Sequence, residues 1–233
     1  MKKFVGYTSN GDYAVGCSGQ TVYVYDRDGK ELAAFKDIKY GYTAKFCPAK
    51  PLFVVKSTGA CFAVYSTEPL GLIQKVRYSN VDASQDDGYC FSADGAYFYN
   101  VERQKTSLNS VISIYDTSHF ERVRMVLNDD GQTEPSYIEA ADDGQIYVLG
   151  FQRGEDGVVS SGFVSRFGDQ GLCDLRVIPY QEYRYYSSFK ALELHGFTEK
   201  KKKSFAMVYP DADMDSIAQT TLPLVELWER YRP

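Results

Sequence analysis

The chain has 233 residues, a formal net charge of −5 at pH 7 and an aromatic share of 15%, with 20 tyrosines but one tryptophan. This length can bury a sizeable core and corresponds to one domain or at most two. The acidic balance provides no basic footprint for phosphates, so we expect no nucleic-acid partner. No apolar run approaches the roughly 18 residues of a membrane span, so we expect no membrane partner either. The excess of tyrosine favours β-structure.

The N-terminal residues and the cysteines indicate the compartment. Met1-Lys2-Lys3 begins like a signal peptide, but the apolar stretch that follows, residues 4–7, is too short for export. The five cysteines are scattered without a Cys-x-x-Cys pair, which is typical of small buried side chains in a reducing compartment. We therefore expect a cytoplasmic protein without disulfides or a zinc site.

Tight polar turns recur along the chain, and each precedes a short run of strand-forming residues. The turns end at Gly11, Lys50, Gly95 and Gly144, which are 39, 45 and 49 residues apart. In each unit a later strand ends on an aromatic residue, and the positions that follow these aromatics are Asp26, Ser66, Asp116 and Gly168. Four short strands per unit, separated by polar turns, are the all-β pattern of a blade-building repeat.

Three of these segments resemble the WD-repeat and related β-propeller families. The turn at residues 92–95 (SADG) resembles the turn between the first two strands of their blades. Val24-Tyr25-Asp26 and Ile114-Tyr115-Asp116 resemble their Trp-Asp ending, with tyrosine in place of tryptophan. The resemblance covers about residues 3–180 and implies a propeller built from degenerate repeats.

The length of the chain divides into about five units of the size of known blade repeats. We therefore expect an all-β chain that forms a single five-bladed β-propeller domain over residues 1–233; the alternative is four blades plus an irregular C-terminal unit. The expected blades cover residues 3–36, 42–76, 88–127, 136–180 and 185–222. The fifth would contain strands at 189–194 and 204–209. A helical spacing of Leu224, Leu227, Trp228 and Tyr231 predicts a short C-terminal helix over residues 222–232.

The motifs that could carry chemistry have simpler structural interpretations. Alternating acids at 211–215 lack the remaining ligands of a calcium loop, and the lysine run at 200–203 fits a solvated hairpin turn. We expect His119 to lie in an exposed turn and His195 to be a hydrogen-bonded histidine of the core or of a strand edge. No nucleophile elbow, phosphate-binding loop or zinc-protease motif occurs. The catalytic residues are therefore unknown, and we expect no metal and no cofactor.

The connections between units carry tyrosines and acids. From the first turn to the aromatic that ends the third strand, the units grow from 14 to 23 residues, and such insertions often mark the binding face of repeat proteins. We expect a Tyr-rich acidic face on a non-catalytic interaction module, with a protein partner of basic character or a small polar ligand such as a sugar. The alternatives are packing of individual rings between blades, and a propeller enzyme or sugar-binding protein that uses carboxylates near a central channel. The candidate binding residues are Tyr40, Tyr42, Tyr78, Asp86, Asp87, Asp130, Glu134, Tyr183, Tyr185 and Tyr186.

Overall fold

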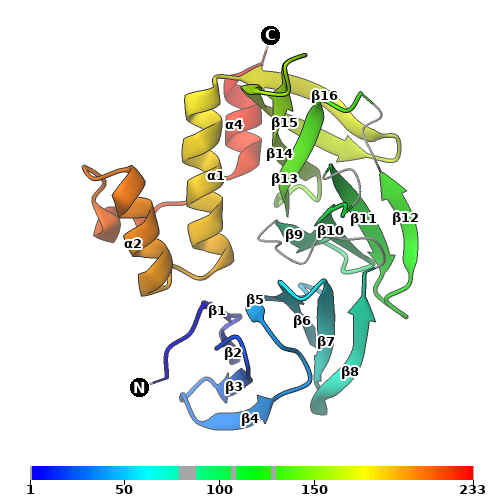
Figure 1. Ribbon diagram of the computed structural model, residues 1–233. Helices are drawn as coiled ribbons and strands as arrows, with labels where there is room; N and C mark the ends of the chain where they lie inside the picture. Colours follow the sequence, from blue (N-terminus) through cyan, green and yellow to red (C-terminus); the bar gives the residue numbers. More distant parts are fainter. Residues whose placement is uncertain (1, 79–87, 106–108, 127–129, 233) are drawn as a thin grey trace. The chain divides into compact units, whose positions relative to one another are not determined.

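The computed structural model describes residues 2–78, 88–105, 109–126 and 130–232. These residues form four antiparallel sheets of four strands each and a helical C-terminal segment (Figure 1). Contacts divide the chain into two compact units. Unit 1 contains residues 2–78 and 191–220, and unit 2 contains the described residues between 88 and 190 together with 221–232.

Unit 1 contains two meander sheets, in which each strand pairs with the next strand along the chain. The first sheet consists of β1 (Gly6–Ser9), β2 (Tyr13–Cys17), β3 (Val22–Asp26) and β4 (Glu31–Phe35), and the second of β5 (Gly41–Phe46), β6 (Leu52–Ser57), β7 (Cys61–Thr67) and β8 (Leu70–Arg77). Apolar residues of the inner strands form one buried cluster that includes Val15, Val24, Phe53 and Tyr65. The inner strands supply most of this core, because a strand pairs with each of their two edges and shields them from solvent.

Unit 2 repeats the same arrangement with two further meander sheets. The third sheet consists of β9 (Tyr89–Phe91), β10 (Tyr97–Arg103), β11 (Ser110–Asp116) and β12 (Arg122–Val126), and the fourth of β13 (Thr133–Ala140), β14 (Ile146–Arg153), β15 (Val159–Gly168) and β16 (Gly171–Ile178). Its buried cluster includes Val101, Ile112, Ile138, Val148 and Phe163. The four predicted units of four strands are therefore confirmed.

The predicted polar turns connect the first two strands of each sheet. At residues 92–95, the Gly95 N–H donates to the Ser92 carbonyl over 2.9 Å and the Ala96 N–H donates to Asp94 Oδ1 over 3.0 Å. Gly95 has a φ of 65°, which glycine adopts without steric cost. Short polar side chains and glycine therefore occupy these positions because the backbone requires them.

The predicted fifth sheet is wrong. Residues 180–217 form α1 (Tyr180–Leu194), α2 (Glu199–Val208) and α3 (Met214–Ile217), so the expected strands at 189–194 and 204–209 are helical. In α1 the buried side chains of Tyr183, Tyr186, Phe189 and Leu192 recur every three residues, a helical spacing that the strand-like aromatic content had obscured. The C-terminal helix predicted over residues 222–232 is confirmed as α4 (Leu224–Arg230).

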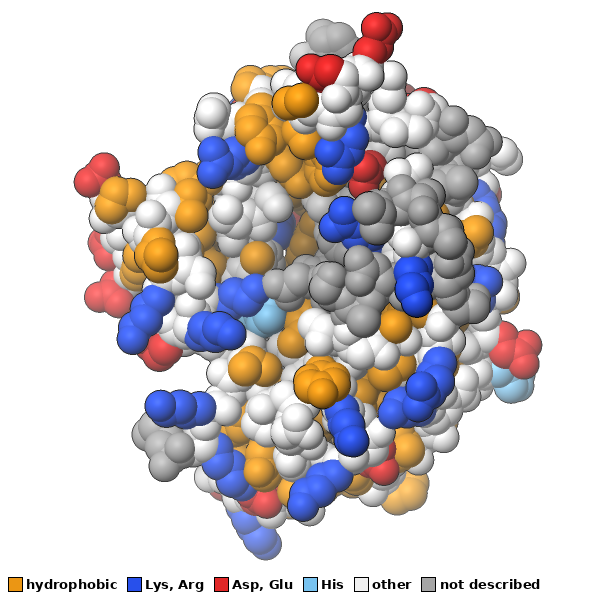
Figure 2. Space-filling model, in the orientation of Figure 1, with side chains coloured by type: hydrophobic (Ala, Val, Ile, Leu, Met, Phe, Trp, Pro, Cys, Tyr) orange, Lys and Arg blue, Asp and Glu red, His pale blue; other side chains and the backbone are white. Residues whose placement is uncertain are grey.

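The lysine run at 200–203 was expected in a hairpin turn, and this expectation is also wrong. These lysines belong to α2, because lysine is a good helix former and no turn residue interrupts the run. Positive side chains gather beside α2 on the face shown in Figure 2. Within the described part of the chain, none of the helices combines the length and apolar character needed to cross a membrane.

In unit 2, α1 and α4 lie side by side and pack on the fourth sheet (Figure 1). Gly162 of β15 allows this close approach, because a Cβ at that position would lie 2.2 Å from Cβ of Tyr183. The buried ammonium of Lys190 pairs with Glu139 of β13 over 2.7 Å. The same carboxylate accepts the N–H of Leu224 at the start of α4. One acid therefore joins both helices to the sheet.

In unit 1, the end of the same helix meets the first sheet through neutral groups. The Tyr7 N–H donates to the His195 carbonyl over 3.2 Å, and His195 Nδ1 donates to the Val5 carbonyl over 2.6 Å. Gly196 ends α1 with a φ of 61°, and hydrogen bonds from the Gly196 and Phe197 N–H groups back into the helix complete a Schellman cap. The buried, hydrogen-bonded state predicted for His195 is confirmed, although it follows a helix instead of a strand.

The five cysteines form no disulfide bond, as the sequence predicted. The side chains of Cys17, Cys47, Cys61 and Cys90 are buried, whereas Cys173 on β16 is exposed. Burial raises the pKa of Cys17 to about 12, so this thiol is unreactive at neutral pH. The four buried cysteines therefore act as small apolar residues of the core.

Candidate functional site

The candidate binding residues of unit 1 do not form one exposed tyrosine face. Tyr40 is 57% exposed, whereas Tyr42 is only 5% exposed, with its ring 5.4 Å from that of His195. Tyr78 is half-buried, and its ring lies 6.0 Å from that of Phe62. Only Tyr40 thus presents its ring freely to solvent. Asp86 and Asp87 lie outside the described residues.

Asp130 and Glu134 lie near the start of β13 in unit 2, where both have structural partners. Asp130 accepts the N–H groups of Gln132 and Thr133, each over 2.9 Å, and the Thr133 hydroxyl over 2.6 Å. Partial burial acts to raise the pKa of Asp130, but the hydrogen bonds together outweigh it and lower the pKa. Glu134 is buried and pairs with Arg153 over 2.7 Å. The two acids therefore cap and brace a turn.

Tyr183, Tyr185 and Tyr186 were expected in a loop, and that placement is wrong because all three belong to α1. Tyr183 and Tyr186 are 9% and 3% exposed, and Tyr185 is half-buried. The Tyr186 hydroxyl accepts a hydrogen bond from Arg230 over 3.2 Å. Burial raises the pKa of Tyr186, against the opposite influence of the Arg230 charge. These rings anchor helices, and the alternative of structural packing describes them better than an exposed interface does.

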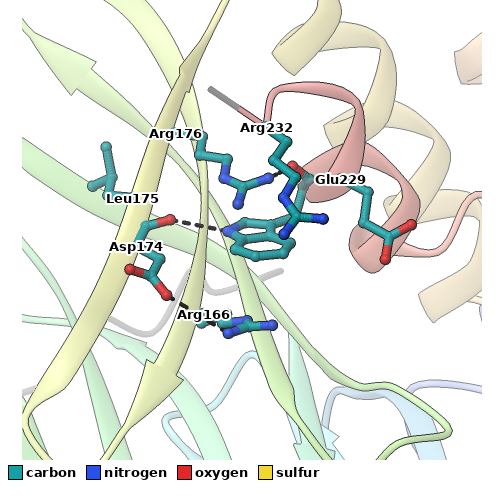
Figure 3. A pocket seen from close by; sticks show the side chains of 7 residues that line it. Arg166, Asp174, Leu175, Arg176, Glu229 and Arg232 are labelled. Atoms are coloured by element: carbon teal, nitrogen blue, oxygen red, sulfur yellow. Dashed lines mark hydrogen bonds and ion pairs between the residues drawn. The ribbon is translucent and has the colours of Figure 1, made fainter.

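The fourth sheet and α4 instead enclose an open pocket of about 590 Å³ that the sequence did not single out (Figure 3). Its lining combines three arginines with the only tryptophan of the chain. Arg166 comes from β15, Asp174, Leu175 and Arg176 from β16, Trp228 and Glu229 from α4, and Arg232 from the residues that follow α4. We call this the Arg–Trp pocket.

Trp228 is the fixed centre of the pocket. Its indole N–H donates to the Asp174 carbonyl over 2.9 Å, and Asp174 has a φ of 51°, which departs from the extended conformation of a regular strand. The pairing of β15 with β16 shifts register opposite this position. A bulge in the edge strand therefore accompanies the carbonyl that anchors the indole.

Two guanidinium groups lie against this indole. The central carbon of Arg176 is 3.2 Å from the ring centroid and that of Arg166 is 4.2 Å away, so both are within the range of cation–π attraction. Arg176 also donates to the Trp228 carbonyl, and Arg166 lies 3.6 Å from the Asp174 carboxylate. These contacts restrict the two side chains before any ligand arrives.

The pocket concentrates positive charge in an acidic protein. Burial, followed by the positive charges of Arg232 and Arg166, lowers the pKa of Arg176, while Asp174 acts in the opposite direction. In Figure 3 the side chains of Arg176 and Arg232 point toward one another and the Glu229 carboxylate turns away from them. Among the described residues, Arg232 has no ion pair. This arrangement suits an anionic group.

Sequence reasoning missed the Arg–Trp pocket because its residues come from two strands and a helix far apart in the chain. Trp228 was noted only as part of an apolar helical stripe, and Arg166 and Arg176 occupy ordinary polar positions of strands. A signal was available in the single tryptophan, since arginine and tryptophan are enriched together at binding sites. The described residues contain no group of three or more His, Cys, Asp or Glu side chains placed to hold a metal ion.

Comparisons with known proteins identify a fold but no family. No protein-family model and no curated protein matches the chain, whereas 819 chains of solved structures do. One of them is hydrazine synthase of Kuenenia stuttgartiensis, with a TM-score of 0.59, 16% identity, and coverage of 74% of this chain and 52% of that chain. The present chain thus spans about half the length of its match. At this identity the likeness shows the fold alone, and the WD-repeat resemblance stays a prediction.

Proposed function

We propose that this protein is a non-catalytic interaction module whose four sheets are the blades of a propeller-like scaffold. Its Arg–Trp pocket would bind an anionic group of a protein partner. The observation that carries the proposal is a pocket in which two arginines lie against one buried indole beside a third arginine, and in which Asp174 pairs with Arg166 alone. Arginine and tryptophan dominate the energetics of many protein interfaces.

Recognition would use guanidinium groups that are already held in place. The indole and the Trp228 carbonyl fix Arg176, while the indole and Asp174 restrain Arg166. Less side-chain entropy is then lost when an anion binds than if the arginines were free in solution. Each guanidinium fork can donate two parallel hydrogen bonds to a carboxylate or phosphate.

This proposal keeps the protein partner expected from the sequence but changes its character. The expected Tyr-rich acidic face called for a basic partner, yet Asp130 already accepts hydrogen bonds in its own turn and Glu134 already pairs with Arg153 of the neighbouring strand. The surplus charge of the Arg–Trp pocket is positive, so it favours an acidic partner. The alternative of a propeller enzyme stays a prediction, since no observation favours a particular catalytic pair.

A pull-down with matched charge variants tests the proposal. The wild-type chain, Arg232→Glu and Arg184→Glu would be immobilised and exposed to extract of the source organism. Arg184 lies on the exposed side of α1 in the same unit, outside the pocket. We expect a partner that binds the wild type and Arg184→Glu but not Arg232→Glu, as detected by mass spectrometry.

Two results would contradict the proposed function. Either the same proteins bind all three baits, or no protein binds any of them. Far-UV circular dichroism of each bait must match the wild type. Arg232 is exposed and lies beyond α4, so its replacement should leave the fold intact.

A further inference from the structure

The balance of charge in the Arg–Trp pocket indicates what kind of anion would fill it. Three arginines and two acids line the pocket, but Asp174 lies 3.6 Å from Arg166, and the carboxylate of Glu229 turns away from Arg176 and Arg232 (Figure 3). Among the described residues, Arg176 and Arg232 therefore have no carboxylate partner. A single carboxylate carries one negative charge, whereas a phosphomonoester carries about −1.5 to −2 at pH 7 and can pair with both guanidinium groups.

The placement of the arginines also favours a compact anion with several acceptors. Arg176 and Arg232 converge from a strand and from the end of a helix, two elements that are fixed to one another by Trp228. The like charges of the two guanidinium groups repel one another, and an anion bound between them would reduce that repulsion. The three acceptor oxygens of a phosphate can take hydrogen bonds from more than one guanidinium at once.

We propose that the Arg–Trp pocket recognises a phosphomonoester carried by the protein partner. This inference rests on the proposed function and adds the chemical class of the recognised group. A phosphorylated side chain and a free phosphate compound share this chemistry. The experiment below separates these two sources.

Trp228 provides the readout, because it is the only tryptophan of the chain and two of the arginines lie against it. Its fluorescence would be titrated with inorganic phosphate, N-acetyl-O-phosphoserine amide and N-acetylglutamate amide. We expect both phosphates to shift the emission and the glutamate derivative to bind at least about tenfold more weakly, because it carries one charge less. The phosphoserine derivative should bind at least as well as inorganic phosphate.

The affinity for a phosphomonoester should depend on pH in a way that the affinity for a carboxylate does not. The second ionisation of a phosphomonoester has a pKa of about 6, so its affinity should rise as the pH is raised from 5 to 7.5. Sulfate, which remains a dianion over this range, should show no such rise. An affinity for the phosphoserine derivative that stays level across this range would contradict recognition of the dianion.

A pair of variants locates the site. Arg232→Gln should weaken binding of the phosphoserine derivative by about tenfold or more, which is the expected loss of one charge-assisted hydrogen bond. Arg184→Gln should bind like the wild type, since Arg184 lies outside the pocket. Equal affinities of the wild type and Arg232→Gln would overturn the proposal, and isothermal titration calorimetry would exclude a silent fluorescence response.

Phosphatase treatment of the captured partner separates this inference from the proposed function. Loss of capture after treatment supports both. A second outcome is capture that depends on Arg232 but resists phosphatase, while phosphate does not change the fluorescence of Trp228. This outcome supports the proposed interaction module and overturns recognition of a phosphomonoester. Binding of inorganic phosphate without binding of the phosphoserine derivative assigns the pocket to a free compound and also overturns the inference.

Discussion

In each unit, helical residues pack on four-stranded sheets, but the contacts differ in their chemistry. In unit 1 the described contacts at the end of α1 include three neutral hydrogen bonds: the Tyr7 N–H and the Thr43 hydroxyl donate to carbonyls of the helix end, and His195 donates to the Val5 carbonyl. In unit 2 the contacts include ion pairs: Lys190 joins α1 to Glu139 of β13, and Arg230 joins α4 to Glu182 of α1.

This difference explains why the candidate site lies in unit 2. In unit 1 the neutral donors and acceptors at the end of α1 form hydrogen bonds with one another. In unit 2 the seam between α4 and the sheet holds more arginines than acids, so Arg176 and Arg232 retain charge that faces solvent. Charged attachment of a helix thus leaves surplus groups that can bind a ligand.

The largest expected effect concerns the ion pair between Glu139 and Lys190 in unit 2. Glu139→Gln keeps an acceptor for the Leu224 N–H but leaves the buried Lys190 without its carboxylate. We expect a loss of about 3 kcal/mol in the free energy of unfolding, because removing one partner of a buried ion pair is strongly destabilising. Urea unfolding followed by Trp228 fluorescence reports on unit 2 directly.

Two companion variants complete this test. Glu139→Gln combined with Lys190→Met should recover part of the loss, since removing both charges also removes the cost of burying them. Thr43→Val in unit 1 removes one neutral hydrogen bond and should cost only about 1 kcal/mol. Equal losses for Glu139→Gln and Thr43→Val would mean that charge does not distinguish the two attachments.

The second prediction concerns the close contact between Gly196 and β1 in unit 1. Gly196 has a φ of 61°, and a Cβ there would lie 1.9 Å from the Tyr7 carbonyl oxygen, whereas Gly19 has a φ of 84° and open space around it. Gly19→Ala should therefore cost about 1 kcal/mol from the backbone conformation alone. Gly196→Ala adds an overpacked contact with β1, so we expect about 2–3 kcal/mol in total.

Urea unfolding followed by far-UV circular dichroism measures both glycine variants. The difference between their free energies of unfolding isolates the close approach of the end of α1 to β1. If Gly196→Ala cost no more than Gly19→Ala, the contact with Tyr7 would not hold this end of α1 in place.

The sheets could be predicted from the sequence because each local signal agrees with the global arrangement. Turns such as residues 92–95 need glycine and short polar residues for backbone reasons, and they mark strand ends directly. The third strands of the first and third sheets end at Asp26 and Asp116, one residue after the aromatic residues at which the repeat predicted the end. These signals are local, so one sequence is enough to read them.

The helical segment and the pocket could not be predicted in the same way. In α1, tyrosines with strand-like propensity occupy helical core positions, because packing on β15 at Gly162 outweighs local preference. The Arg–Trp pocket depends on the bulge at Asp174 and on the docking of α4. Such long-range contacts leave no local pattern in the sequence.

The smallest expected effect concerns the two Tyr-Asp endings, one in each unit. The Asp116 carboxylate accepts the N–H groups of Ser118, His119 and Glu121 over 3.0, 2.9 and 3.2 Å, whereas Asp26 accepts two N–H groups in its own turn. Asp116→Ala should cost about 1 kcal/mol at pH 7, and Asp26→Ala somewhat less.

The pH dependence of Asp116 provides the finer measurement. The hydrogen bond from the His119 N–H, with those from Ser118 and Glu121, lowers the pKa of Asp116 below its ordinary value of 3.8 despite partial burial. The folded state thus favours the carboxylate, so its stabilisation is complete above about pH 4 and is lost as the pH falls through the lowered pKa. Urea unfolding of wild type and Asp116→Ala should therefore show a gap that narrows between pH 6 and pH 3. A gap that stays constant would mean that the turn is held by its backbone, because the charge of the carboxylate would then contribute nothing.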